Sequence, residues 1–587
     1  MDIYSILTLL GGFAFFMFGM NLFSGSLEKM WGGKLESLLK KTRSNKLRGL
    51  LLGGAITMAL QSSSAVTVML IGLVNSGVMN LGQSSTIIMG SNIGTTVTAW
   101  ILALSGTQSD LPFLRIFRPE LFYALPAVLG MCIVTLTKSD RKKTVGSALI
   151  GFSIIMTGMH MMTISLEPLS QSRLFLKVIG LLNNPFIALF VGTAVTALVR
   201  SSVASVAGLQ CLAANGIISF AMAIPTIMGQ NIGTCIRALI SSRDANKNAK
   251  RVSLIHLLFN LIGTIVFLTI YCLSNHFMTS SFENMPITLF EIALAHTIFN
   301  VATAIILFPF SKQLENLAGL IVKDKSSNKE KEENYSFIDI RLLSTPSVAI
   351  RECNSKCKQM AKLTQEMIFA SFSLITKYEE ATAKELAKNE DILDMYEDKL
   401  GSFLVKLATK EISEADSKSV SRQLHSIVDL ERIGDHAMNI LGLAQDLHSK
   451  KIHFSDTAKD ETDILISALT EIINTTTDAY TTNNIALAKH IEPLEEAIDQ
   501  LINDIKAQHI ERLKSGECSI ELGFILSDLL TNCERVSDHC SNIAIAIIET
   551  PQLSFDAHEY INDIKNGTNS DFESDYAMFK TKYSISE

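Results

Sequence analysis

Polar side chains interrupt one of the most apolar stretches of the chain. The run Gln-Ser-Ser-Ser occupies positions 61–64, and a related run, Arg-Ser-Ser-Val, lies 139 positions later at 200–203. Serine hydroxyls and free backbone N–H groups at a helix N-terminus favour an anion. Hydroxyl and carbonyl oxygens ligate hard cations such as sodium. Both runs are therefore candidate ion-binding sites, with the candidate residues Gln61, Ser62, Ser63, Ser64, Ser201 and Ser202.

The two runs belong to an internal repeat. Gly53–Ile101 aligns with Gly192–Ile240 without a gap, and Met-Gly-x-Asn-Ile-Gly-Thr occurs at Met89–Thr95 and again at Met228–Thr234. Isolated serines and threonines often only mediate close helix packing in membranes, but a duplicated pair of motifs at fixed spacing favours function. We predict that Gly94 and Gly233 interrupt their helices. The supporting candidates are Asn92, Thr95, Thr96, Asn231 and Thr234.

Arg200 is the main departure of the second copy from the first. An arginine at membrane depth costs about 3 kcal/mol or more, so it is a functional candidate by default. It could bind an oxyanion as a bidentate donor, or it could occupy a sodium site. The alternative is that it reaches the membrane surface or pairs with a carboxylate. Val203 and Cys235 also replace hydroxyls that the first copy has at Ser64 and Thr96.

Hydropathy divides the chain into two unlike halves. Residues 1–310 are almost continuously apolar, whereas residues beyond 323 are rich in Lys, Glu and Asp. We therefore predict an all-α protein, with a polytopic domain in a lipid bilayer followed by a soluble helical-bundle domain. Residues 3–24 are expected to be a retained helix and not a cleaved signal peptide. The predicted spans are 3–24, 84–104, 121–137, 145–166, 222–241, 254–274 and 288–308.

Basic residues set the predicted topology. They gather in the loops 28–48, 138–143 and 243–251, which places these loops in the cytoplasm and the N-terminus outside. The locations of the loops agree with the number of membrane crossings only if the segments around Gln61 and Arg200 are re-entrant hairpins. The repeats, about 5–139 and 144–278, then cross the membrane three times each, so the second copy is inverted and a final helix at 288–308 follows. Such inverted repeats with broken helices are typical of secondary transporters.

The charged half also repeats. Glu431-Arg-Ile-Gly-Asp435-His matches Glu534-Arg-Val-Ser-Asp538-His, and the Glu and Asp of each copy share one helix face. With His436 and His539 they are candidate ligands of a divalent metal; the alternative is a salt-bridged face, because an Arg follows each Glu. We expect a charged linker at 311–340, tandem three-helix bundles at 341–552 and a weakly structured tail at 553–587.

Several functional classes are not indicated. The chain has no Gly-x-x-x-x-Gly-Lys-Ser/Thr nucleotide loop, no Cys-x-x-Cys pair and no nucleophile–base constellation, so no enzyme is predicted. With a net charge of −7 and no basic patch, no nucleic acid is expected as a partner. His256 and Asn260, like His296 and Asn300, share a helix face, and we interpret both pairs as hydrogen-bonding residues between helices, in preference to a proton relay.

At its paired motifs the chain resembles the type II sodium–phosphate cotransporter family. The first copy is complete at 61–64 and 92–96, and the resemblance covers about residues 5–310. It implies sodium-driven transport of inorganic phosphate by alternating access. By position, Gln61, Ser62, Ser63, Ser64, Ser201 and Ser202 would hold phosphate and sodium between the hairpin tips. Asn92, Thr95, Asn231 and Thr234 would support them.

The Glu-x-x-x-Asp motifs resemble those of the PhoU family of phosphate-signalling regulators. The resemblance implies metal sites that include Glu431, Asp435, Glu534 and Asp538. The prediction is a sodium–phosphate symporter of the cytoplasmic (inner) membrane with a cytoplasmic regulatory domain. A homodimer is compatible with this prediction. Its rivals are a membrane-bound phosphate sensor and a transporter or exporter of another anion. Deletion of residues 340–587 is predicted to leave a folded membrane domain.

Overall fold

The computed structural model describes residues 3–41, 45–104, 119–277, 281–323, 337–410, 412–516, 518–549 and 570–585. These residues form helices joined by turns, with one isolated β-bridge between Ser219 and Pro286, so the predicted all-α class is confirmed. The chain divides into an N-terminal unit, Met1–Val348, and a C-terminal unit, Ala349–Glu587.

Five helices of the described residues are long and apolar enough to cross a membrane. They lie in α1 (Ile3–Lys41), α4 (Leu81–Ala103), α6 (Asp140–Leu166), α11 (Lys247–Phe277) and α12 (Leu289–Leu307). A sixth span would be the pair Arg173–Asn183 and Pro185–Val199, which is bent by 106°. The predicted spans 121–137 and 222–241 are not among the five. They correspond to α5 (Pro119–Leu136), whose described apolar part Tyr123–Leu136 is short, and to α10 (Phe220–Ser241). The N-terminal unit contains α1 (Ile3–Lys41), α2 (Lys46–Leu60), α3 (Ser63–Asn75), α4 (Leu81–Ala103), α5 (Pro119–Leu136), α6 (Asp140–Leu166), α7 (Arg173–Ile179), α8 (Pro185–Val199), α9 (Ser202–Ala214), α10 (Phe220–Ser241), α11 (Lys247–Phe277), α12 (Leu289–Leu307) and α13 (Ser311–Ile321).

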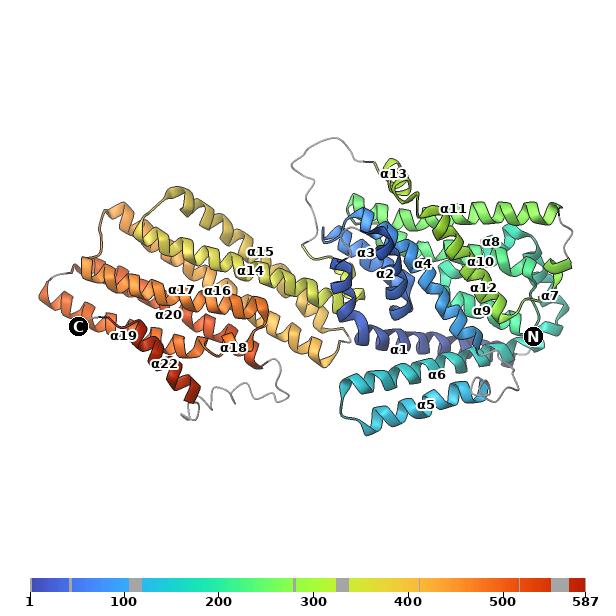
Figure 1. Ribbon diagram of the computed structural model, residues 1–587, viewed down its shortest axis with the longest axis horizontal. Coiled ribbons are helices and arrows are strands. Elements are labelled where there is room, and N and C mark those ends of the chain that lie inside the picture. Colours follow the sequence, from blue (N-terminus) through green and yellow to red (C-terminus); the bar gives the residue numbers. More distant parts are fainter. Residues whose placement is uncertain are drawn as a thin grey trace. The chain divides into compact units, whose positions relative to one another are not determined.

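The duplication is visible in the helix boundaries. Helices α8 and α9 begin and end 139 residues after α2 and α3, and α10 begins 139 residues after α4. The side chains of Asn45 and Asn184, also 139 apart, cap α2 and α8 by accepting backbone N–H bonds. In each copy the first arm of the broken helix packs on the long helix, as α2 packs on α4 and α8 on α10, while α1 lies beside α6 (Figure 1).

Glycine determines how closely these helices approach. A Cβ atom on Gly90 would lie 1.8 Å from the carbonyl oxygen of Leu50, and one on Gly229 would lie 2.0 Å from that of Leu189. Gly94 and Gly233 are also confined, with a carbonyl oxygen 2.5 Å from the place of a Cβ. The prediction that these two residues interrupt their helices is wrong, because α4 and α10 run through them without a break. Their missing side chains allow backbone-to-backbone packing instead.

Long amphipathic helices build the C-terminal unit around a buried apolar core. Helix α16 packs on α15 and on α20, and α20 also packs on α17 and α19 (Figure 1). Buried Arg512 holds Glu461 through two hydrogen bonds of 2.5 and 2.6 Å. The helices are α14 (Pro346–Thr376, which begins just before the unit boundary), α15 (Glu380–Ala408), α16 (Glu414–Lys450), α17 (Asp456–Thr482), α18 (Ile485–Ala488), α19 (Ile491–Ser515), α20 (Ile520–Glu549) and α22 (Ser570–Lys582).

Two segments differ from expectation. Residues 570–582, predicted to be weakly structured, form α22, because Phe579 and Tyr583 are buried and Lys582 reaches Glu471 at 2.7 Å. The range 311–340, expected as a linker, begins with α13, whose Glu315 accepts a hydrogen bond from Ser85. The short 3-10 helix η6 (Ile340–Ser344) also belongs to the N-terminal unit. Residues 324–336 and 550–569 lie outside the described residues.

These boundaries change where the chain can be cut. The deletion of 340–587 would remove Arg341 and Leu342, which pack inside the N-terminal unit. We therefore expect a chain ending at Val348 to be monodisperse in detergent by size-exclusion chromatography, and a chain ending at Asp339 to show a lower thermal midpoint. Equal midpoints would contradict the assignment of residues 340–348 to this unit.

Candidate functional site

Each hairpin turns at a single residue in the left-handed region. Gln61 ends α2 with φ 53°, and Arg200 ends α8 with φ 57°. The next residue in each case, Ser62 or Ser201, is extended and caps the second arm by accepting a hydrogen bond of 3.2 Å from a backbone N–H. Four N–H groups at a helix start lack a partner within the helix, and the serine satisfies one of them. The two serine runs therefore form the same turn twice.

The side chains at the two turns have different surroundings. Gln61 is 6% exposed; its amide donates to the carbonyl of Met58, and its Oε1 accepts a 2.6 Å hydrogen bond from Thr98. Arg200 is exposed. Ser63 and Ser64 are buried at the first turn, while Ser202 of the second is partly exposed. The first turn is thus closed by its own repeat and the second is open.

A narrow crevice joins the two repeats. Thr95 and Thr98 of α4 line it together with Ser202 and Val203 of α9 and His296 of α12. It brings a residue of the Asn-Ile-Gly-Thr motif of the first copy to the serine turn of the second. One of its lining residues, Thr98, donates the hydrogen bond to Gln61. The crevice is closed to a water molecule as it stands, and it is our candidate location for the substrate and ion site.

Two histidines orient the duplicated asparagines. Nε2 of His256 lies 3.1 Å from Oδ1 of Asn92, and Nε2 of His296 lies 3.4 Å from Oδ1 of Asn231. Because an amide oxygen only accepts, each Nε2 carries the proton. Nδ2 of Asn92 is buried and has no hydrogen-bond partner in the described part of the chain, whereas Asn231 donates to Ile227. These contacts agree with the interpretation of the histidines as hydrogen-bonding residues between helices.

The remaining motif hydroxyls bond their own helices. Thr95 and Thr234 donate to carbonyls one turn earlier at 3.1 and 2.9 Å, and Thr96 donates to Ile93 at 2.8 Å. Their oxygens remain able to accept a hydrogen bond or to ligate a cation.

Sequence reasoning missed two residues of this region, Thr98 and Arg237. Thr98 closes the first turn, and Arg237 lies 139 positions after it and is exposed. The signal was available, since the same spacing relates Gln61 to Arg200. Both positions follow the Asn-Ile-Gly-Thr motif by only three residues.

Acidic side chains gather beside the two Glu-x-x-x-Asp motifs of the C-terminal unit. Burial, and then the neighbouring Asp435 and Asp394, raise the pKa of Glu431 to about 7. On the second copy, Glu495, Asp499 and Asp538 place ligand oxygens within 4.8 Å of one another. Sequence reasoning missed Glu495 and Asp499, although they too are spaced by four on one helix.

Burial and neighbouring carboxylates reduce the negative charge of this second cluster, because they raise the pKa values of two of its members. Burial and the nearby Asp499 raise the pKa of Glu495 to about 9, and burial together with Glu534 raises that of Asp499 to about 6. Glu534 itself accepts a 3.0 Å hydrogen bond from Lys506. Of the four predicted metal ligands, the structure therefore brings only Asp538 into this group of three.

The histidines of the motifs lie elsewhere. His436 and His539 stack on each other between α16 and α20 with ring centroids 5.7 Å apart. His436 bonds Asn532 at 2.8 Å and His539 bonds Asp429 at 3.0 Å. The structure does not bring them to the group Glu495, Asp499 and Asp538, because their turn of the helix faces the partner helix. They hold the two bundles together.

The donor set at Glu495, Asp499 and Asp538 fits a hard divalent cation. Carboxylate oxygens are the ligands such ions prefer, and burial, followed by mutual repulsion, raises the pKa values of Glu495 and Asp499 in the absence of a counter-charge. When bound, the ion would supply that positive charge and hold α19 to α20.

Comparisons with known proteins bear on both units. Residues 15–164 and 154–294 match the family described as Na+/Pi-cotransporter, and residues 357–444 and 464–547 match the PhoU domain. The chain is 21% identical over 560 residues (95% of this chain, 100% of the relative) to YjbB of Escherichia coli K12, whose name assigns it provisionally to inorganic phosphate export.

Two further relatives each cover one part of the chain. A PhoU homologue of Thermotoga maritima, named as a phosphate-specific transport system accessory protein, is 24% identical over 36% of this chain and 91% of its own length. The sodium-dependent phosphate transport protein 2A of Rattus norvegicus is 35% identical over 112 residues, which is 19% of this chain and 17% of that protein.

The shifted pKa of Glu495 makes a metal test possible. Because this carboxyl is protonated at pH 7 in the ion-free state, Mn2+ should displace about one proton on binding. We expect the calorimetric binding enthalpy of the full chain to vary with the ionisation enthalpy of the buffer. Glu495→Gln should remove that dependence, and the exposed control Glu385→Gln should not. Binding of Mn2+ without proton release would contradict the assignment.

The raised pKa of Glu495 also predicts that the ion-free protein loses stability as pH rises from about 5 towards 9.

Proposed function

Because residues 15–294 of the chain belong to the Na+/Pi-cotransporter family and two PhoU domains follow them, we propose a function in phosphate transport. The proposed protein is a sodium-dependent symporter of inorganic phosphate with a PhoU-like regulatory domain. The observation that carries the proposal is the duplicated serine turn, in which Ser62 and Ser201 cap the helices behind two left-handed residues.

The geometry supplies both kinds of ligand that co-transport needs. Backbone N–H groups at the starts of α3 and α9, the serine hydroxyls and the unpartnered amide of Asn92 are donors for phosphate. Hydroxyl and carbonyl oxygens around Thr95 and Thr234 are acceptors for sodium. The proposed site residues are those of the sequence motifs, Gln61, Ser62, Ser63, Ser64, Asn92, Thr95, Thr96, Arg200, Ser201, Ser202, Asn231 and Thr234, joined by Thr98.

Helix length supports the proposed membrane arrangement. The arms α3 and α9 have 13 residues each, which is about 20 Å and less than the hydrocarbon core. We propose that they are re-entrant and that the two repeats are inverted, with the N-terminus outside and the PhoU domains in the cytoplasm. Alternating access would then move one repeat against the other around the crevice. We do not propose an enzymatic reaction.

The second candidate function is phosphate export. The name of the full-length relative YjbB favours it, and it uses the same site with the opposite net direction. A phosphate sensor that moves little substrate is the third, because an arginine at the site would hold the anion firmly.

Flux into proteoliposomes distinguishes these functions. With sodium imposed outside, we expect uptake of radiolabelled phosphate that disappears when potassium replaces sodium. Arg200→Gln should raise the half-saturating phosphate concentration by roughly tenfold, which is the loss of affinity expected when a charge-assisted hydrogen bond is removed. Arg173→Gln, an exposed arginine of α7, is the matched control. Release of preloaded phosphate without sodium dependence would favour export, and binding without flux would favour the sensor.

A further inference from the structure

Arg237 occupies the position that Thr98 has in the first repeat. In that repeat Thr98 donates to Gln61 at 2.6 Å, so the long helix and the turn residue are in contact. Arg200 and Arg237 are the residues 139 positions after Gln61 and Thr98. The second repeat therefore carries two arginines where the first carries a neutral hydrogen-bonded pair.

The helix register of the second repeat supports this correspondence. Gly94 packs on the carbonyl of Gly54 and the Cβ of Thr57. Gly233 packs in the same way on the carbonyl of Thr193 and the Cβ of Thr196. On each helix this glycine contact lies one turn before the residues compared, Gln61 and Thr98 in the first repeat and Arg200 and Arg237 in the second. Arg200 and Arg237 thus start from backbone positions equivalent to those of a bonded pair.

The charge of this pair is not balanced by the surrounding chain. No Asp or Glu occurs between Glu167 and Asp244, and neither arginine has an ion pair with a described residue. Both side chains are exposed, whereas Gln61 and Thr98 are each 6% exposed. Two guanidinium groups offer ten N–H donors in planar forks that match oxyanions. Their mutual repulsion is relieved by an anion that carries two charges.

We propose that Arg200 and Arg237 together form a paired-guanidinium site that selects doubly charged oxyanions at the second serine turn. The inference deepens the proposed function, on which it rests. It makes monohydrogen phosphate the bound species and lets sulfate compete, whereas dihydrogen phosphate and monovalent anions bind weakly.

Equilibrium binding tests the pair without any need for flux. Radiolabelled phosphate is titrated against the purified full chain at pH 6 and pH 8. In wild type we expect tighter binding at pH 8, where phosphate is doubly charged, and competition by sulfate. Arg237→Thr, which restores the residue of the first repeat, should weaken binding about tenfold and reduce its pH dependence. Arg173→Gln is again the control.

Two results would count against these ideas, and they differ. Wild-type binding that Arg237→Thr leaves unchanged overturns the arginine pair and leaves the proposed function intact. Failure of wild type to bind phosphate at either pH overturns the proposed function. Arg237→Lys separates charge from geometry, since it should keep the pH dependence and lose affinity.

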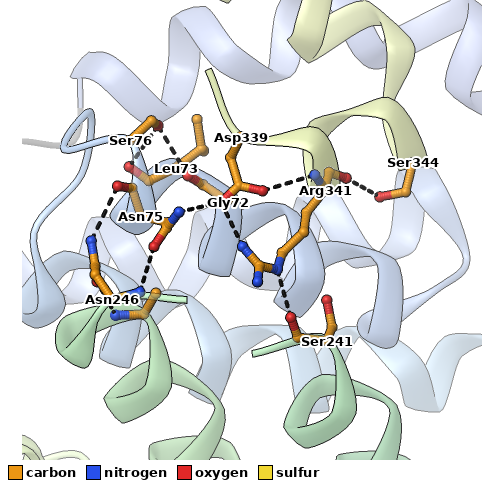
Figure 2. A network of polar contacts seen from close by, with 10 residues as sticks. Gly72, Leu73, Asn75, Ser76, Ser241, Asn246, Asp339, Arg341 and Ser344 are labelled. Atoms are coloured by element: carbon orange, nitrogen blue, oxygen red, sulfur yellow. Dashed lines mark hydrogen bonds and ion pairs between the residues drawn. The ribbon is translucent and has the colours of Figure 1, made fainter. Parts of the chain in front are cut away.

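A second inference comes from a buried polar network that ties residues 339–342 to both repeats (Figure 2). Asp339 is 1% exposed. Its carboxylate accepts from Nδ2 of Asn75 at 2.5 Å, from the backbone N–H of Arg341 at 2.8 Å and from the guanidinium of Arg341 at 2.7 Å. The charge is therefore paired and both carboxylate oxygens accept hydrogen bonds, which is what burial of a carboxylate requires.

The same network reaches the second repeat. Arg341 donates through Nε to the carbonyl of Ser241, the last residue of α10, at 2.5 Å. Asn246, in the turn before α11, donates its backbone N–H to Asn75 at 2.7 Å and its side-chain amide to the carbonyl of Asn75 at 3.1 Å. Figure 2 shows Asp339 and Arg341 lying between Asn75 and Ser241.

Apolar packing completes the contact. Leu342 is fully buried, and a Cβ on Gly72 would lie 2.9 Å from its side chain. Gly72 and Asn75 belong to the last turn of α3, whose first turn follows the cap Ser62. A 13-residue helix is a stiff rod of about 20 Å. Restraint at its end is therefore felt at the serine turn.

The contact exists on one repeat. The position that matches Asn75 is Ala214, and the following Asn215 bonds Thr163 of α6 at 3.0 Å instead. The docked segment also continues directly into α14 at Pro346, the first helix that leads into the PhoU domains.

We infer that the segment 339–342 is an autoinhibitory brake, which restrains α3 against the end of α10 and is released through the PhoU domains. This inference also rests on the proposed function. While the segment is docked, the two repeats are held together at this end and the movement of alternating access is slowed.

Two variants release the brake from opposite sides, Asn75→Ala and Asp339→Asn. Docking is read by trypsin, because Arg341 is bonded and largely buried, so cleavage before Leu342 should be slow in wild type and fast in both variants. Sodium-driven phosphate flux should rise roughly tenfold, the factor that the loss of a charge-assisted hydrogen bond implies for a two-state equilibrium. Asn215→Ala, which removes the unrelated contact at the end of α9, should change neither.

The outcomes separate the two levels of inference. Faster cleavage with unchanged or lower flux overturns the brake. Unchanged cleavage in both variants shows that Asp339 does not hold the segment and overturns it as well. Absence of flux from wild type and from every variant overturns the proposed function instead.

Discussion

A helix that begins inside an apolar unit leaves backbone N–H groups that must find partners, and this constraint shapes the N-terminal unit. The chain meets it twice in the same way. Gln61 and Arg200 reverse the chain in the left-handed region, and Ser62 and Ser201 cap the arm that follows. What remains unsatisfied at each turn is a cluster of donors, which only protein, water or an anion can complete. The same feature is thus a structural demand and the proposed binding site.

Close packing makes the turns rigid enough to use. The glycines of α4 and α10 let α2 and α8 approach backbone to backbone, so that each turn is fixed against its own long helix. The two copies then diverge in their surroundings. The first is closed by the Gln61–Thr98 hydrogen bond, and the second exposes two arginines. Duplication supplied the frame, and substitution at a few positions made one half neutral and the other cationic.

Electrostatics also governs the C-terminal unit, in the opposite sense. Burial and then mutual repulsion raise the pKa values of the carboxyl groups of Glu495 and Asp499 on α19, and a cation would relieve the repulsion. Between the bundles, His436 and His539 exchange equivalent contacts with Asn532 and Asp429 across α16 and α20. The repeat motif therefore serves two purposes on neighbouring helix faces, an acidic cluster on one and an interface on the other.

The sequence by itself determined the all-α class, the duplication and its spacing, the two hydropathic halves and the motifs that carry both family resemblances. These follow from periodicity and identity along the chain, which need no knowledge of contacts. Only the tertiary structure decided that Gly94 and Gly233 pack helices instead of breaking them, because a glycine reads the same in either role. It also decided that the motif histidines face a partner helix, and that residues 339–342, at the boundary between the expected linker and the expected bundles, dock on α3 and α10. Asp339 and Arg341 resemble any solvated charges in sequence, and what distinguishes them is the burial that distant residues impose.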